Sequence, residues 1–307
     1  MRSKGKILVI RGGAIGDFVL TLPVLAALRR QFPDSHLEVL GYPHIAALAL
    51  HGGLADAVRP VEARALASFF TDMGDLDDAT GHYFASFHII LSYLYDPDGF
   101  FAENVKACSK AQFIPGPHRP DETKPIHATG VLLKPLERLA IFDADPVPRL
   151  SLKTAALVVP VLAVHPGSGS EKKNWPQPHW AKFLAHVMSG TEWNVLLVGG
   201  EAEGNRLAEL AAPLPSSRVR LLQSQPLPEL ATSLRTCLGF IGHDSGITHL
   251  AAAVGLPGLA LWAESNEAIW HPRSEAFRVL RNSDGIAHLS PETTFTVLKN
   301  LLSACAS

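Results

Sequence analysis

Short runs of apolar residues alternate along the chain with longer segments in which apolar and polar positions recur at helical spacing. In the first half, residues 6–11, 36–40 and 88–92 have the length and apolar content of buried strands. Residues 22–30 and 45–51 have the spacing of helices. This β-α-β-α order predicts a doubly wound parallel sheet.

The succession begins again after residues 115–151, which are rich in proline and interrupted by a helical piece at 129–142. We place the interdomain linker at 143–157. The second series comprises strands at 158–164, 193–198, 219–222, 238–241 and 258–262 and helices at 178–189, 203–211, 227–236, from Thr248 and from Ser290. We therefore predict an α/β fold with domains at 1–152 and 153–288. A final helix at 289–307 stays in the second domain or returns to the first.

Composition narrows the class of protein. A chain of 307 residues with 47% hydrophobic and 18% charged residues is long enough for two globular domains. A net charge of −2 argues against a nucleic-acid binder that works by bulk charge. The three cysteines are far apart and fit a reduced, cytoplasmic compartment. No apolar run is long enough for a signal peptide or a membrane span, and peripheral contact with a membrane surface stays compatible.

The most informative segment is 240–257, a strand end, a polar turn and a helix that opens on small residues. In the turn, Asp244, Ser245 and Gly246 can cap the helix while its remaining amides and dipole attract an anion. His249, one turn later, can add a donor or a charge. The segment suits a diphosphate or a nucleotide sugar; it is equally compatible with an ordinary helix cap.

A second segment, 165–180, also follows a predicted strand. Gly167, Ser168 and Gly169 allow the backbone to approach a ligand closely, and Lys172 or Lys173 can place a charge on a phosphate. A solvated lysine loop is the alternative. After the next strand, Glu201 or Glu203 can bind ribose hydroxyls or simply begin an acidic helix.

The glycine-rich loop after the first strand has glycines at 12, 13 and 16, which do not fit the dinucleotide fingerprint, and no Gly-Lys-Ser/Thr follows for a phosphate-loop NTPase. Its notable residue is Asp17. The carboxylate either complements the dipole of the next helix or is presented to the cleft as a general base. Asp-x-Asp pairs at 75/77, 96/98 and 143/145 do not follow convincing strands of a nucleotide domain, and we interpret them as acidic loops.

Three motifs in chain order resemble glycosyltransferase family 9, the heptosyltransferases of bacterial lipopolysaccharide core assembly. They are Arg-Gly-Gly-Ala-Ile-Gly-Asp at 11–17, Lys-Asn-Trp-Pro at 173–176 and Gly-His-Asp-Ser-Gly-Ile-Thr-His at 242–249. The resemblance implies a GT-B fold, in which two Rossmann-like domains face a central cleft. It implies inverting transfer, without metal or other cofactor, from a nucleotide sugar, typically ADP-heptose. The acceptor would be a glycan or lipid-linked glycan at the cytoplasmic face of the inner membrane.

Residue by residue, the resemblance matches Asp17 to the family's catalytic acid and Lys173 to its phosphate-contacting lysine. It matches two further sets: the donor-binding residues Asp244, Ser245, Gly246, His249, Ser168, Gly169 and either Glu201 or Glu203, and the acceptor-side residues Arg11, Gly13 and Gly16.

The chain departs from the family beside the expected base. Leu20 stands where histidine is usual, and Arg-Gly-Gly-Ala at 11–14 stands where Lys-x-Ser-Ser is usual. The acceptor therefore stays open. So do two alternatives: a GT-B enzyme that uses another nucleotide, and a non-catalytic nucleotide-sugar-binding relative.

Overall fold

The computed structural model describes residues 5–72, 76–152 and 159–306. The chain forms two compact units, Met1–Pro146 and Val147–Ser307, each built on its own parallel sheet. The division lies inside the predicted linker 143–157, earlier than the predicted division at 152/153; residues 153–157 of that linker lie outside the described residues.

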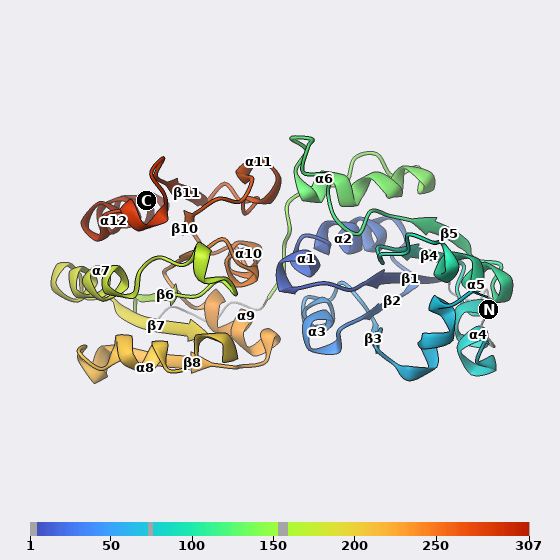
Figure 1. Cartoon of the computed structure of the whole chain (residues 1–307), viewed down its shortest axis with the longest axis horizontal. Helices are drawn as coiled ribbons and strands as arrows, with labels where there is room; N and C mark the ends of the chain where they lie inside the picture. The colour runs from blue at the N-terminus through green and yellow to red at the C-terminus, as the bar shows by residue number, and fades with distance from the viewer. Residues whose placement is uncertain (1–4, 73–75, 153–158, 307) are drawn as a thin grey trace. The chain divides into compact units, whose positions relative to one another are not determined.

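The first unit has a five-stranded parallel sheet in the order β3-β2-β1-β4-β5 (Figure 1). Its strands are β1 Lys6–Arg11, β2 His36–Gly41, β3 Ala57–Pro60, β4 Ile89–Ser92 and β5 Gln112–Pro115. Its helices are α1 Ile15–Val19, α2 Leu22–Gln31, α3 Pro43–His51, α4 Asp78–Ala85, α5 Phe100–Cys108 and α6 Ala128–Leu133, with 3₁₀ helices at Arg64–Phe70 and Lys134–Leu139. The helical piece predicted at 129–142 is thus shorter, because its α-helical part gives way to a 3₁₀ turn that contains Pro135.

The second unit has a six-stranded parallel sheet in the order β11-β10-β9-β6-β7-β8. Its strands are β6 Val161–His165, β7 Asn194–Gly199, β8 Val219–Gln223, β9 Gly239–His243, β10 Gly258–Trp262 and β11 Phe277–Arg281. Its helices are α7 Gln177–Gly190, α8 Arg206–Ala211, α9 Leu227–Arg235, α10 Gly246–Ala253, α11 Glu267–Trp270 and α12 Pro291–Ala306, with 3₁₀ helices at Glu171–Lys173, Glu201–Glu203, Ser216–Arg218 and Ile286–His288.

The terminal helix α12 belongs to the second unit. It packs against α7 and β10 (Figure 1). Its residues Leu298 and Leu302 join the apolar core that Trp175, Trp180 and Phe183 share with the strands. Of the two courses that the sequence left open for residues 289–307, the structure shows the helix staying with the second sheet.

The chain reverses its direction of strand addition once in each sheet. In the first unit the reversal lies between β1 and β4, where Ile10 pairs with Ser92. In the second it lies between β6 and β9, where His165 pairs with Gly242. The loops that leave two such strands diverge, which opens a crevice at the carboxyl ends of the strands, the usual ligand position in this architecture. Each unit therefore has one topological switch point. The glycine loop begins at that of the first unit, and the lysine loop of segment 165–180 and the Asp-Ser-Gly turn begin at that of the second.

Candidate functional site

At the switch point of the second unit, an ion pair joins the two loops. Lys173 closes the 3₁₀ turn that follows β6, and its Nζ lies 2.6 Å from Oδ2 of Asp244, directly after β9. The hydroxyl of Ser265 donates to the same oxygen at 2.5 Å. The side chain of Asp244 is 10% exposed and that of Lys173 is 37% exposed. The ammonium group of Lys173 thus keeps donors for a ligand. The side chain of the neighbouring Lys172 is exposed to solvent.

The Asp-Ser-Gly turn begins helix α10 as predicted. Ser245 is the N-cap residue, and its hydroxyl accepts a hydrogen bond from the amide of Thr248 at 3.3 Å. Gly246 is the first helical residue and is half-buried. A cap satisfies only part of the first turn, so the other leading amides, with the helix dipole, favour an anion next to Lys173. His249 is 6% exposed and already engaged by other groups, so it lies inside the unit.

His243 fixes the backbone of the lysine loop through both of its ring nitrogens, a role that the sequence did not reveal. Its Nε2 accepts from the backbone amide of Trp175 at 2.8 Å, and its Nδ1 lies 3.2 Å from the carbonyl oxygen of Gly167. These partners require a neutral ring with the proton on Nδ1. Burial lowers the pKa of His243 to about 3, which agrees with a neutral structural histidine. His165, also buried, has its pKa lowered to about 4 by burial.

Within the lysine loop, the hydroxyl of Ser168 lies 2.7 Å from Oδ1 of Asn174 and 2.9 Å from the carbonyl oxygen of Ser170. Gly169 is exposed and has a φ of +73°, a conformation that favours glycine. Ser168 therefore shapes the loop from within, and Gly169 leaves its backbone open to solvent.

The two candidate glutamates differ in exposure. Glu203 is buried, accepts from the amide of Gly200 at 2.6 Å and lies against Gly167, where an added Cβ would come within 1.8 Å of its Oε1. Glu201 is exposed. Glu201 is consequently the one whose carboxylate is accessible to a nucleoside, while Glu203 supports the loop.

At the switch point of the first unit, Asp17 lies in helix α1 with both carboxylate oxygens engaged. Its Oδ2 accepts from the amide of Ala14 at 3.0 Å, and its Oδ1 lies 3.3 Å from Nη2 of Arg11. Gly13 has a φ of +97°, and an added Cβ there would come within 2.9 Å of Oδ2. Gly16 lies in the first turn of α1, where its carbonyl accepts from the amide of Leu20.

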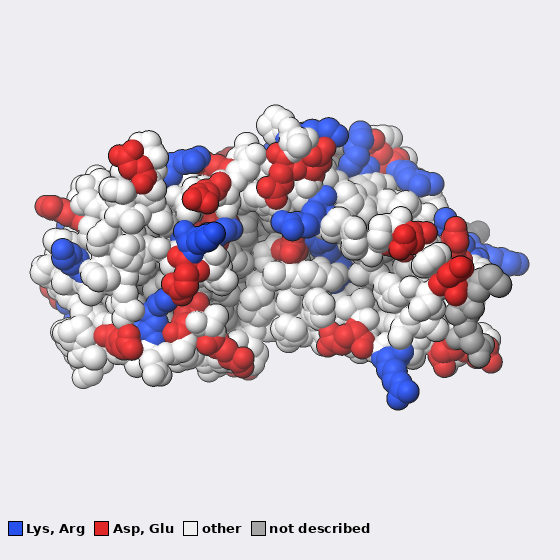
Figure 2. Space-filling model, in the orientation of Figure 1, with Lys and Arg blue, Asp and Glu red and all other residues white. Residues whose placement is uncertain are grey.

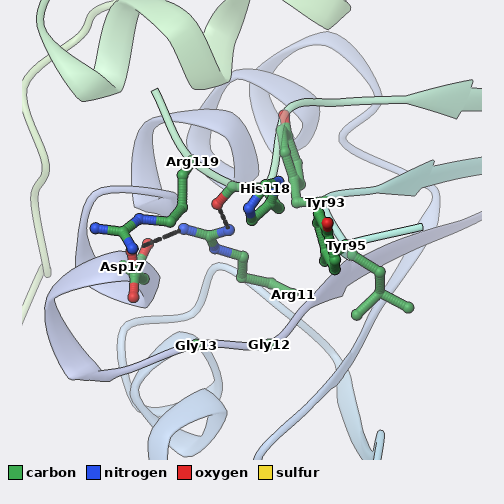
Figure 3. A pocket seen from close by; sticks show the side chains of 9 residues that line it. Arg11, Gly12, Gly13, Asp17, Tyr93, Tyr95, His118 and Arg119 are labelled. Carbon is green, nitrogen blue, oxygen red and sulfur yellow. Dashed lines mark hydrogen bonds and ion pairs between the residues drawn. The ribbon is translucent and has the colours of Figure 1, made fainter. Parts of the chain in front are cut away.

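Arg11, Gly12, Gly13 and Asp17 line one side of a pocket of about 180 Å³ (Figure 3). Its other wall consists of Tyr93, Leu94 and Tyr95, after β4, and of His118 and Arg119, in the loop after β5. The rings of Tyr95 and His118 are 4.6 Å apart, and Tyr95 is 67% exposed. The sequence pointed to neither His118 nor Arg119, because no motif surrounds them and only the fold brings them opposite Asp17.

Most other aromatic residues of this region are core. Phe69, Phe84 and Phe87 are at most 4% exposed and belong to the apolar cluster of the first unit.

One aspartate of each Asp-x-Asp pair has a structural partner. Asp77 caps α4, and Asp96 accepts from the amides of Phe101 and Ala102. Asp143 pairs with Arg30, and Asp75 lies outside the described residues. In the described ranges, no group of three or more His, Cys, Asp and Glu side chains is arranged to hold a metal ion.

Acidic and basic side chains are interspersed on the face shown in Figure 2. That face therefore carries no broad positive field that would attract an anion. Among the residues that the structure describes, no helix is both long and apolar enough to span a membrane.

Comparison with known proteins gives a consistent result. The family model described as glycosyltransferase family 9 (heptosyltransferase) matches residues 142–305. Lipopolysaccharide heptosyltransferase 1 of Pseudomonas aeruginosa is 33% identical over 132 residues, an alignment that covers 43% of this chain and 33% of that protein. The matched region is thus a minor part of that relative's length.

Two solved structures share the fold. A glycosyl transferase family 9 protein from Veillonella parvula superposes with a TM-score of 0.79 at 17% identity, covering 99% of each chain. A heptosyltransferase of Escherichia coli, solved with ADP, superposes with a TM-score of 0.76 at 15% identity, covering 96% of this chain and 99% of that chain. The two parallel-sheet units are therefore those of the GT-B fold, as the sequence predicts.

Proposed function

The chain belongs to glycosyltransferase family 9, and on that premise we propose that it is an inverting, metal-independent transferase that moves a heptose from ADP-heptose to a lipopolysaccharide-core or related glycan acceptor. The observation that carries the proposal is the Lys173–Asp244 ion pair beside the first turn of α10, at the switch point of the second sheet. Together these groups make a site for a diphosphate. The ADP named with the Escherichia coli structure supports the choice of nucleotide.

The second unit would bind the donor. Lys173 would move part of its interaction from Asp244 to the diphosphate, and the leading amides of α10 would bind the phosphate oxygens that gain charge as the nucleotide leaves. Glu201, the exposed one of the two glutamates, would be the group that reaches the ribose. No metal is needed in this scheme because a cation and a helix N-terminus already face the diphosphate.

The first unit would bind the acceptor and remove its proton. An acceptor hydroxyl attacks the anomeric carbon, the new C–O bond forms as the bond to the diphosphate breaks, and the hydroxyl proton passes to the carboxylate of Asp17. The attack inverts the anomeric centre. Asp17 lines the pocket and each of its oxygens retains a lone pair for the incoming proton.

The cellular partner would be the growing lipopolysaccharide core. The name of the Pseudomonas relative supports this acceptor. With such an acceptor the protein would act in the cytoplasm, in peripheral contact with the inner membrane.

Ligand-linked thermal stability tests the donor. All five tryptophans, Trp175, Trp180, Trp193, Trp262 and Trp270, lie in the second unit, so their fluorescence reports on the unit that would bind the nucleotide. We expect ADP and ADP-heptose to raise the midpoint, unchanged by magnesium or EDTA. A preference for UDP or GDP would overturn the sugar nucleotide. A lack of response to every nucleotide would favour a degenerate relative that has lost donor binding.

A further inference from the structure

One guanidinium group joins three segments of the first unit. Arg11, the last residue of β1, donates from Nη1 to the carbonyl oxygen of His118 at 2.8 Å. Its Nη2 lies 3.3 Å from both the backbone oxygen and Oδ1 of Asp17 (Figure 3). The strand end, helix α1 and the loop that carries His118 and Arg119 thus meet at a single side chain.

Burial of the Arg11 guanidinium is unfavourable for the free energy of folding. Arg11 is 4% exposed, and within the described part of the chain its Nε has no hydrogen-bond partner. Burial lowers the pKa of Arg11, an effect that the charge of Asp17 and the nearby ring of Tyr93 oppose. Removing a cation from water without satisfying all its donors costs free energy. A packed apolar residue would avoid that cost, so stability alone does not account for an arginine here.

The contacts do account for the orientation of Asp17. The Ala14 amide holds Oδ2 and Arg11 holds Oδ1, so the plane of the carboxylate is fixed from two sides. At the same time Nη1 holds the His118 carbonyl, which fixes the opposite wall of the pocket relative to that carboxylate. A point charge such as lysine can make one of these contacts but cannot span both with a rigid fork.

We propose that Arg11 is a positioning residue: its guanidinium sets the orientation of the Asp17 carboxylate and its distance from the His118–Arg119 wall, and it does not itself bind the acceptor. This inference rests on the proposed role of Asp17 as the base. It also narrows the role of Arg11, which the sequence placed only on the acceptor side, because both terminal nitrogens of its guanidinium already donate to protein oxygens.

The test compares two arginines of the same unit. Arg29 makes the same kinds of contact at the opposite end of the sheet: Nη1 to the Ser35 carbonyl, Nη2 to Asp56, and a buried Nε without a partner. Asp56, like Asp17, also accepts from a backbone amide, that of Leu37. Arg29→Met therefore measures what the loss of such an arginine does to the unit when no reaction depends on it.

We expect Arg11→Met to lower kcat about 100-fold with the donor KM within about twofold of the parent, because a misplaced base costs rate rather than donor affinity. Arg11→Lys should recover about tenfold of that loss, and so should millimolar guanidinium added to Arg11→Met, because each restores part of the fork. Guanidinium should not activate the parent, Asp17→Asn or Arg29→Met.

A crystal structure of Arg11→Met provides a readout that does not need turnover. We expect Asp17 to leave the Ala14 amide or to occupy a second rotamer, with the His118 carbonyl displaced. If Asp17 and the loop keep their positions, the inference is overturned, whether or not the parent shows transfer. If the carboxylate moves but kcat and guanidinium response match Arg29→Met, the positioning role is overturned as well. A parent that binds no nucleotide would instead overturn the proposed function, and the crystal structure would still decide the role of Arg11.

Discussion

The two switch points occupy the same place in their sheets and are built in different ways. In the second unit, the groups that we propose for donor binding are backbone amides of α10 and a lysine paired with Asp244 on the neighbouring turn. In the first unit, a carboxylate is held by an arginine whose other partner is 107 residues away, and aromatic side chains form the wall. The second unit presents fixed dipoles, which suit a ligand of constant chemistry such as a diphosphate. The first unit depends on side chains from several loops, which suit a reacting group and a variable acceptor.

The largest expected effect is a loss of turnover in Asp17→Asn, without a matching loss of ADP affinity. Asn at position 17 keeps the shape of the side chain but cannot take the acceptor proton, so Asp17→Asn should lower turnover by about 10²–10⁴. Affinity for ADP should stay within about twofold, because no described contact links Asp17 to the lysine loop. Turnover and isothermal titration with ADP measure the two quantities. Near-normal turnover would remove Asp17 from the chemistry.

The next largest expected effect is a loss of ADP affinity when Lys173 of the second unit is replaced. Lys173→Met removes the cation beside α10 and leaves the buried carboxylate of Asp244 without a counter-charge, so ADP affinity should fall about 10- to 100-fold. Lys172→Met, one residue earlier and exposed, is the matched control and should bind ADP like the parent. Equal losses in both variants would mean that the loop contributes only diffuse charge.

Acid should affect the second unit through its buried histidines. The folded-state pKa values of His243 and His165 are lowered by burial to about 3 and about 4, below the value of about 6.5 of an exposed histidine. The unfolded chain therefore takes up protons first, and stability that is fully present above pH 6.5 is lost as the pH falls toward 4. The loss is at most about 1.4 kcal/mol per pH unit for each histidine.

Urea unfolding followed by tryptophan fluorescence at pH 7, 6 and 5 measures this loss. His243→Gln should flatten the pH dependence, even though it lowers stability at pH 7, whereas His186→Gln, in the same unit and half-buried, should not change the slope. An equal slope in the His243 variant and the parent would contradict a neutral buried imidazole.

The smallest effect concerns the backbone beside Asp17. Gly13→Ala and Gly53→Ala both place alanine at positive φ, +97° and +67°, and each should cost about 1 kcal/mol of folding stability. Only at Gly13 does the added Cβ meet the carboxylate, since nothing lies within 4 Å at Gly53. Turnover should therefore fall several-fold in Gly13→Ala alone. An equal loss of turnover in both variants would mean that Gly13 contributes to folding stability and not to the reaction.

The sequence revealed the second crevice better than the first for a physical reason. Lys173, Asp244 and Ser245 lie in loops directly after buried strands, where apolar runs mark the strand ends and cap residues mark the helix start. His118 and Arg119 lie in a loop without such a pattern, and only the pairing of β4 with β5 brings that loop to the pocket. The sequence also gave no sign that His243 faces inward, since a polar residue in a turn is ordinarily exposed.

The strands that the sequence did not reveal share a property. Strands β3, β5 and β11 are sheet edges, and each is partly exposed, so none shows the continuous apolar run that identified the central strands. The short helices α4 and α5 went unpredicted as well. The central strands and their following loops, which build the switch points, were predicted because burial on both faces demands an apolar run.

The central claim is that donor binding and proton removal reside in different units, and the donor dependence of turnover tests it most directly. Rates of Asp17→Asn and Lys173→Met, measured side by side over a range of ADP-heptose at saturating acceptor, give kcat and the donor KM of each. We predict that Asp17→Asn lowers kcat with an unchanged KM, and that Lys173→Met raises KM at least about tenfold. If Asp17→Asn instead raises the donor KM as much as Lys173→Met does, the division of work between the two crevices is contradicted.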